Sequence, residues 1–267
     1  MLNGEKQKVF GVPDSLTLAS AKEWLKKRIS EKRFKHTEGV VDTACELARR
    51  SGCDEFHAQL AAWLHDCCKE VKADDLIAEA KSYGIVLHPV DEINGHLLHG
   101  PVAAAKVRAE LGLTDSSILN AIAEHTLGAV NMTLLSKVIF LADALEPGRD
   151  PDYCKPIWQA LHPCVWPDDV EETLASKDFS AEPTSKSRLQ LTDQSLLDKT
   201  DHGATTFQGL RGLEALKLTG KIKPDLDKAV LVAIDLGLTD LIASQRAIHP
   251  KTVEVRNYYL QIIKSRL

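Results

Sequence analysis

The sequence lacks any apolar run that approaches the roughly 20 residues a helix needs to cross a bilayer. Its longest runs are short ones such as Val138–Ala142. The first ten residues contain lysines but no apolar stretch of the kind found in export signals. The 6 cysteines among 267 residues are too few and too irregularly spaced for the disulfide framework of a small secreted protein. We therefore expect reduced thiols, no membrane span and a cytoplasmic location.

An excess of positive charge is also missing. The chain has 33 Lys and Arg against 38 Asp and Glu, which gives a net charge of −5 with neutral histidines. Such a balance provides no basic field to hold a nucleic-acid backbone or an anionic membrane. Any phosphate chemistry must then rely on local cations or on a metal ion. With 44% apolar and 27% charged residues, the chain is able to bury a sizeable core.

No stretch alternates with the period of two that marks a strand, whereas apolar residues recur at helical spacing from Leu16 to Leu145. The fold class expected is therefore all-α. Glycines after several of these segments and a capping aspartate such as Asp54 set the helix ends. The pattern predicts helices over residues 31–50, 54–69, 73–83, 100–111, 115–125 and 134–145, then a helical pattern from Leu210, a long helix over 226–241 and a last helix after Pro250.

The composition changes after Arg149. Four prolines between Pro151 and Pro167 precede a stretch, residues 171–206, that is rich in Ser, Thr, Asp and Lys. We read 1–149 as a domain core, 150–208 as an insertion or mobile loop, and 209–267 as C-terminal helices that complete the same domain. The insertion could serve as a lid, as a partner-binding arm or as a passive loop, and the loop is the interpretation we favour.

Histidines and aspartates interrupt otherwise apolar helical faces. A buried carboxylate without partners is costly, and a divalent metal would supply the compensating charge. Any one such histidine is more often a hydrogen-bonded core residue than a ligand. Together on separate segments of one domain, they favour a metal site over that alternative. The set comprises His36, His65, Asp66, His99, His125 and Asp143.

Imidazole and carboxylate ligands without thiolate suit iron, manganese, cobalt, nickel or zinc better than magnesium or calcium. A metal held this way lowers the pKa of bound water and polarises a phosphoryl oxygen, so hydrolysis is the expected use. Cations lie within one or two helical turns of the candidate ligands: Arg33, Lys69 and Arg149. Each taken alone is more often a surface charge. Cys154, His162 and Cys164 lack the paired spacing of a zinc site, so we predict no metal there.

The order of these residues resembles the HD-domain metal-dependent phosphohydrolases, an all-helical superfamily. Several local strings are more specific and resemble its YqeK-like branch, the symmetrical bis(5'-nucleosyl)-tetraphosphatases. The resemblance covers residues 16–149 and 210–263, and the long insertion departs from it. The strings are Arg33-Phe-Lys-His36, Leu64-His-Asp-Cys-Cys-Lys69, Leu98-His-Gly-Pro-Val-Ala103, His125-Thr-Leu-Gly128, Leu141-Ala-Asp-Ala-Leu-Glu-Pro-Gly-Arg149, Ile248-His-Pro-Lys-Thr-Val253 and Arg256-Asn257.

This resemblance implies an iron-centred enzyme that cleaves diadenosine tetraphosphate into two ADP molecules, with manganese, cobalt or nickel as alternative metals. By position it implies the metal ligands His36, His65, Asp66 and Asp143. Asp66, His99 and His125 would be catalytic, and the last two would either contact phosphate or complete a second metal site that Asp66 bridges. Phosphate would be held by Arg33, Lys69 and Arg149. Asn257 and Arg256 are candidates to close the nucleotide site, although a helix-packing role is equally consistent.

Two other interpretations stay open at this point. An HD phosphohydrolase could act on guanosine tetraphosphate, a deoxynucleotide or a cyclic dinucleotide instead. A nucleotide-sensing protein could also retain the HD core without turnover, although a binding protein has no need of every hydrolytic ligand. The sequence does not decide the oligomeric state, and a homodimer is one option.

Overall fold

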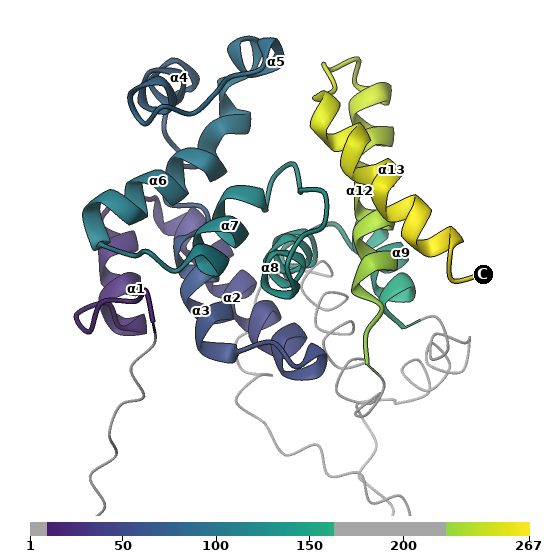
Figure 1. Cartoon of the computed structure of the whole chain (residues 1–267), viewed down its shortest axis with the longest axis horizontal. Helices are drawn as coiled ribbons and strands as arrows, with labels where there is room; N and C mark the ends of the chain where they lie inside the picture. The colour runs from purple at the N-terminus through teal and green to yellow at the C-terminus, as the bar shows by residue number, and fades with distance from the viewer. Residues whose placement is uncertain (1–9, 163–222) are drawn as a thin grey trace, which may run out of the picture.

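The computed structural model describes residues 10–162 and 223–267, and in these two ranges the regular secondary structure is entirely helical. Figure 1 shows the arrangement. The predicted all-α class is confirmed. The helices of the first range are α1 (Leu18–Lys26), α2 (Glu31–Ser51), α3 (Glu55–Leu64), α4 (Ala73–Ser82), α5 (Pro89–Ile93), the 3₁₀ helix η1 (Gly95–Leu98), α6 (His99–Leu111), α7 (Ser116–Glu124), α8 (Leu134–Ala144) and α9 (Pro151–Leu161).

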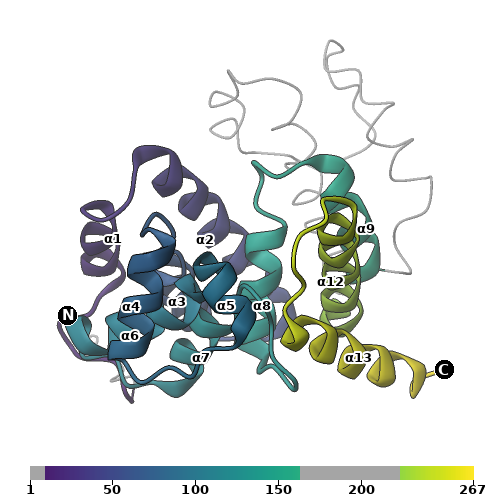
Figure 2. The ribbon, with the colours of Figure 1, turned by 90° about the horizontal axis from the view of Figure 1, so that it is seen from above.

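Helix α8 lies at the centre of the fold and packs against α2, α3, α7 and α12 (Leu226–Ala243). Seen from above, α8 separates the N-terminal helices from α9, α12 and α13 (Pro250–Lys264) (Figure 2). Its apolar residues explain this position, because Val138, Ile139 and Leu141 are fully buried. Burial of such side chains is the main force that holds helices together in a fold of this kind.

Local signals set most helix ends as the sequence predicts. Asp54 and Asp115 cap α3 and α7 by accepting hydrogen bonds from backbone N–H groups of the first turn. Gly52 and Gly112 end α2 and α6 with φ of +77° and +68°, a conformation that glycine adopts without strain. The positions of these helices thus follow from short-range chemistry that is visible in the sequence.

The helix predicted over 54–69 is shorter than expected. Helix α3 ends at Leu64, and the chain continues in turns, with Cys67 N–H donating to the Leu64 carbonyl (3.3 Å) and Lys69 N–H to that of Asp66 (3.0 Å). These tighter turns replace the α-helix at His65 and Asp66, and both residues are buried. The end of α3 therefore places two candidate ligands at a helix terminus.

The segment assigned to an insertion also begins differently from the prediction. Its first residues, Pro151–Leu161, form α9, which packs against α12 and buries Ile157 and Trp158. Pro151 stands at the first turn, where a missing N–H costs no helical hydrogen bond. Residues 171–206, Cys164 and the start of the predicted helical pattern at Leu210 lie outside the described residues, so the remainder of the proposed division stays a prediction.

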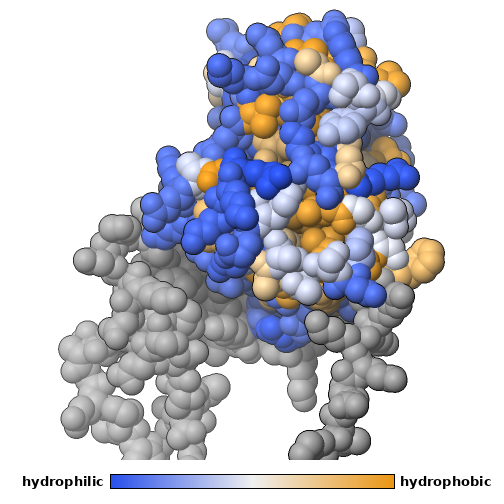
Figure 3. All heavy atoms as spheres, turned by 90° about the vertical axis from the view of Figure 1, so that its left-hand side faces the viewer, coloured by the Kyte–Doolittle hydropathy of each residue, from blue (hydrophilic) through white to orange (hydrophobic). Residues whose placement is uncertain are grey.

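The chain returns to the end of α9 after this segment. The N–H of Asp225 donates a hydrogen bond to the carbonyl of Leu161 (2.9 Å), and Asp225 then caps α12 by accepting from Lys228 N–H. Helices α12 and α13 follow as predicted after 226 and Pro250. No helix in the described part of the chain is both long and apolar enough to span a membrane. On the face shown in Figure 3, hydrophilic residues predominate and apolar ones form small separate patches.

Candidate metal centre

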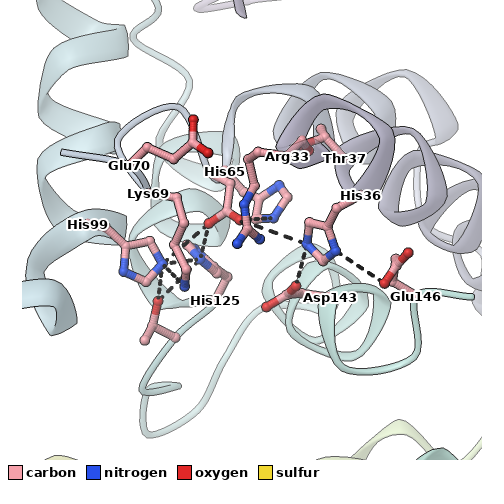
Figure 4. Close-up of polar contacts among 12 residues, drawn as sticks. Arg33, His36, Thr37, His65, Lys69, Glu70, His99, His125, Asp143 and Glu146 are labelled. Carbon is pink, nitrogen blue, oxygen red and sulfur yellow. Dashed lines mark hydrogen bonds and ion pairs between the residues drawn. The ribbon is translucent and has the colours of Figure 1, made fainter. Parts of the chain in front are cut away.

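The candidate ligands come from five separate elements that meet beside α8. Helix α2 contributes His36 from its interior, and the turn after α3 contributes His65 and Asp66. His99 begins α6, His125 ends α7, and Asp143 lies in the last turn of α8. All six residues predicted as a set are brought together. Figure 4 shows the cluster.

Asp66 is the carboxylate that joins the histidines. Its Oδ2 lies 3.6 Å from His65 Nε2 and 3.8 Å from His36 Nε2, and its Oδ1 lies 3.4 Å from the Nε2 atoms of both His99 and His125. Only 1% of Asp66 is exposed. Burial opposes ionisation, yet the pKa of Asp66 is held well below its usual range, and the Arg33 guanidinium pairs with its Oδ2 at 3.1 Å. The carboxylate is therefore ionised and available to a cation.

Three histidines are oriented by backbone carbonyls. In His65, His99 and His125 the Nδ1 atom lies 2.6, 2.5 and 2.7 Å from the carbonyl oxygen three residues earlier. A carbonyl only accepts, so each ring carries a proton on Nδ1, and in the neutral ring this leaves a lone pair on Nε2. This is the tautomer required of a histidine that ligates a metal through Nε2.

His36 is oriented differently. Its Nδ1 lies 3.1 Å from Glu146 Oε2, while its Nε2 lies 3.1 Å from Asp143 Oδ1. Burial desolvates the ring, but the hydrogen bonds to the Asp143 and Glu146 carboxylates outweigh this and raise the pKa of His36 to about 9. In contrast, burial lowers the pKa of His65 to about 4.

The Nε2 lone pairs of His65, His99 and His125 converge on Asp66, and only some of these acceptors have a donor nearby. His99 Nε2 and His125 Nε2 are 2.9 Å apart although both are acceptors in this tautomer. His65 Nε2 and Asp66 Oδ1 are buried with no hydrogen-bond partner. Orphaned buried acceptors of this kind are costly unless a cation joins them. The donor set therefore fits a divalent metal.

Ligand atoms within 4.8 Å of one another form two groups that share His65. One group consists of His36, His65 and Asp143, and the other of His65, Asp66 and His125. Since His99 Nε2 lies beside His125 Nε2, the second group has one further donor at hand. The arrangement offers ligands for one or two metals.

The three predicted phosphate-binding cations border the cluster. Arg33 Nη1 lies 3.1 Å from Asp66 Oδ2, Arg149 Nη2 lies 2.6 Å from Asp143 Oδ1, and Lys69 Nζ lies 3.1 Å from His99 Nε2. Lys69 and Arg149 thus mark opposite ends of the cluster, with Arg33 between them. In this structure, Arg33 and Arg149 form ion pairs with the two carboxylates, and Lys69 contacts an imidazole of the cluster.

Two residues at the site carried no role in the sequence analysis. Thr126 Oγ1 lies 3.0 Å from His99 Nε2 and 3.2 Å from His125 Nε2, and Glu146 contacts His36 as described. Both lie within strings that the resemblance uses, yet neither interrupts an apolar face. The polar contacts of Asn257 and Arg256 do not reach the cluster. The exposed Asn257 side chain pairs with Arg256 Nη1 (3.4 Å), and Arg256 Nε pairs with Asp235 (2.7 Å).

Comparison with known proteins agrees with this geometry. Residues 33–148, which include the six candidate ligands, match the HD domain. The chain is 44% identical over 128 residues to a protein of Halalkalibacterium halodurans and 43% identical over 128 residues to one of Bacillus subtilis, covering 47% of this chain and 66% and 67% of those proteins. A Staphylococcus aureus protein is 39% identical over 139 residues, covering 50% of this chain and 69% of that protein. All three are named symmetrical bis(5'-nucleosyl)-tetraphosphatases.

A solved structure resembles the whole fold. It is a predicted HD superfamily hydrolase from Clostridium acetobutylicum, described as involved in NAD metabolism, with 26% identity and a TM-score of 0.63. The alignment covers 92% of this chain and 98% of that one. The likeness therefore extends beyond the residues that match the HD domain.

Proposed function

Because this chain belongs to the HD-domain family of symmetrical bis(5'-nucleosyl)-tetraphosphatases, we propose that it hydrolyses diadenosine tetraphosphate into two molecules of ADP. The observation that carries the proposal is the buried cluster of Nε2 lone pairs around Asp66, which is fitted to a divalent metal and bordered by cations. A protein that only bound nucleotide would gain little from burying His65 Nε2 and Asp66 Oδ1 without a hydrogen-bond partner.

A divalent metal is implied by the HD domain and by the ligand cluster, and we propose iron, with manganese, cobalt or nickel as substitutes. When bound, the metal would activate a water molecule and polarise a phosphoryl oxygen. His36, His65, Asp66 and Asp143 would hold it. His99 and His125 would serve a second ion that shares Asp66, or would contact phosphate if only one ion binds.

The cations would hold the phosphates on either side of the reacting bond. Lys69 stands at the His99 end of the cluster and Arg149 at the Asp143 end, while Arg33 lies between them. A polyphosphate that lies across the cluster would be held on both sides, which suits cleavage at its middle. Positive charge fixed near the departing diphosphate would also stabilise the negative charge that develops there.

Product analysis tests this function. The protein, prepared metal-free and then loaded with Fe²⁺ without oxygen or with Mn²⁺, is incubated with diadenosine tetraphosphate and the products are separated by chromatography. We expect metal-dependent release of ADP alone. Release of ATP with AMP would mean that the wrong bond is attacked. Binding without product would favour a nucleotide sensor, and turnover of guanosine tetraphosphate in a parallel reaction would favour a different substrate.

We expect the reaction to take place in the cytoplasm.

A further inference from the structure

His36 lies in the interior of a helix, whereas His65, His99 and His125 lie at helix ends. His65 and His125 stand at the ends of α3 and α7, where the last carbonyls of a helix have no helical partner. Their Nδ1 protons use such carbonyls. His36 lies within α2, and the carbonyl three residues before it, that of Arg33, already accepts from the Thr37 hydroxyl (3.0 Å). A side chain must therefore supply the acceptor for His36.

Glu146 supplies it, and its own position is fixed. Its Oε2 lies 3.1 Å from His36 Nδ1, its Oε1 accepts the N–H of Gly148 (2.9 Å), and only 8% of the residue is exposed. Gly39 makes room for it, since a Cβ there would lie 3.0 Å from Glu146 Cγ. With both oxygens used and its stem enclosed, the carboxylate has little freedom to turn away.

We infer that Glu146 is a positioning residue, which holds the His36 proton on Nδ1 and so presents Nε2 to the metal. The inference rests on the metal site of the proposed function. A carboxylate partner also makes an imidazole a stronger ligand than a carbonyl does, because it carries a full negative charge. His36 is the histidine of the cluster with such a partner on Nδ1, as far as the described residues extend.

Titration of the metal-free protein with Mn²⁺, without nucleotide, tests this role through Glu146→Gln. The glutamine keeps the shape, but its NH2 group must take the place of one of the two oxygens that accept from His36 Nδ1 and Gly148 N–H, and an NH2 group cannot accept. We expect Mn²⁺ to bind about 10- to 100-fold more weakly. The matched control is Glu110→Gln, which neutralises an exposed carboxylate paired with Arg28 (2.7 Å) and should bind Mn²⁺ as the wild type does. Wild-type affinity in Glu146→Gln would overturn the inference.

Kinetics separate positioning from a direct part in the reaction. With saturating Mn²⁺, Glu146→Gln should regain the wild-type kcat with an unchanged KM for diadenosine tetraphosphate. A kcat that stays low when the metal site is full would place Glu146 in the chemistry and overturn the positioning role. The Mn²⁺ titration needs no substrate, so a chain that fails to cleave this nucleotide would refute the proposed function and leave this test intact.

The wild-type protein gives an answer even if the variant does not fold, which circular dichroism would reveal. With Zn²⁺ bound, two-bond ¹⁵N–¹H spectra of the imidazole rings report which nitrogen carries the proton. His36 should be protonated at Nδ1 and bound to metal through Nε2. Ligation through Nδ1 would overturn the inference.

Discussion

Neutralising Asp66 should remove metal binding and turnover together. Its carboxylate lies within 3.4 to 3.8 Å of the Nε2 atoms of His36, His65, His99 and His125, so a cation held by these rings must lie close to it. At about 4 Å and an effective dielectric constant of about 20, two unit charges attract by about 4 kcal/mol. Losing that attraction weakens binding about a thousandfold for each unit of positive charge on the metal ion. A divalent ion should therefore bind Asp66→Asn at least a thousandfold more weakly.

The assay is Mn²⁺ titration together with product chromatography for Asp66→Asn, with the exposed Asp74→Asn as the matched control. Asp66→Ala should behave like the asparagine variant. Helical content should change little in either, since the apolar core that holds α2, α3 and α8 remains in place. If Asp66→Asn binds Mn²⁺ or cleaves substrate as the wild type does, the assignment of the metal centre is wrong.

Three further predictions concern binding and stability. Lys69→Ala, which removes the ammonium 3.1 Å from His99, should raise the KM for diadenosine tetraphosphate about tenfold or more, whereas a larger effect on Mn²⁺ affinity would contradict a phosphate-binding role. Leu64→Ala empties a fully buried site next to His65 and should lower the free energy of unfolding by roughly 3 to 5 kcal/mol in urea denaturation, and a loss under 1 kcal/mol would refute the packing argument. Burial, with Arg50 nearby, lowers the pKa of His162 to about 4, so the stability that depends on a neutral His162 is present above pH 6.5 and is lost as the pH falls toward 4. Urea denaturation at pH 7.5 and pH 5 should show that the free energy of unfolding falls by roughly 2 kcal/mol more in the wild type than in His162→Leu. Equal losses in the two proteins would refute this account.

Most of the helices could be predicted because their signals are local. Apolar spacing and caps such as Asp54 and Asp115 act over a few residues, so the predicted bounds agree with α2, α4, α6, α7 and α8 to within one or two positions. Helix α9 was missed because its prolines suggested a loop. Pro151 fits a first turn, and Cys154, Ile157, Trp158 and Leu161 show the helical spacing that would have identified it.

The grouping of the six candidate ligands was predictable for a different reason. A histidine or aspartate on an apolar face has a cost that must be offset, and the cost is visible in the sequence. Glu146 gave no such signal, because its partner His36 lies 110 positions earlier and only folding brings the two together. Thr126 was missed because a threonine beside a helix end is unremarkable in sequence. The substrate contact predicted for Asn257 stays a prediction.

The hydrogen bond between Leu161 and Asp225 has a consequence for how this chain tolerates change in length. The two residues that border residues 162–224 are joined backbone to backbone, so the chain leaves and re-enters the helical framework at a single point. The entropic cost of closing a loop there grows only slowly with its length, by about 0.6 kcal/mol for each doubling. Evolution could therefore lengthen or shorten this stretch without moving α9, α12 or the candidate ligands. The same point offers a site for grafting a foreign domain onto the framework.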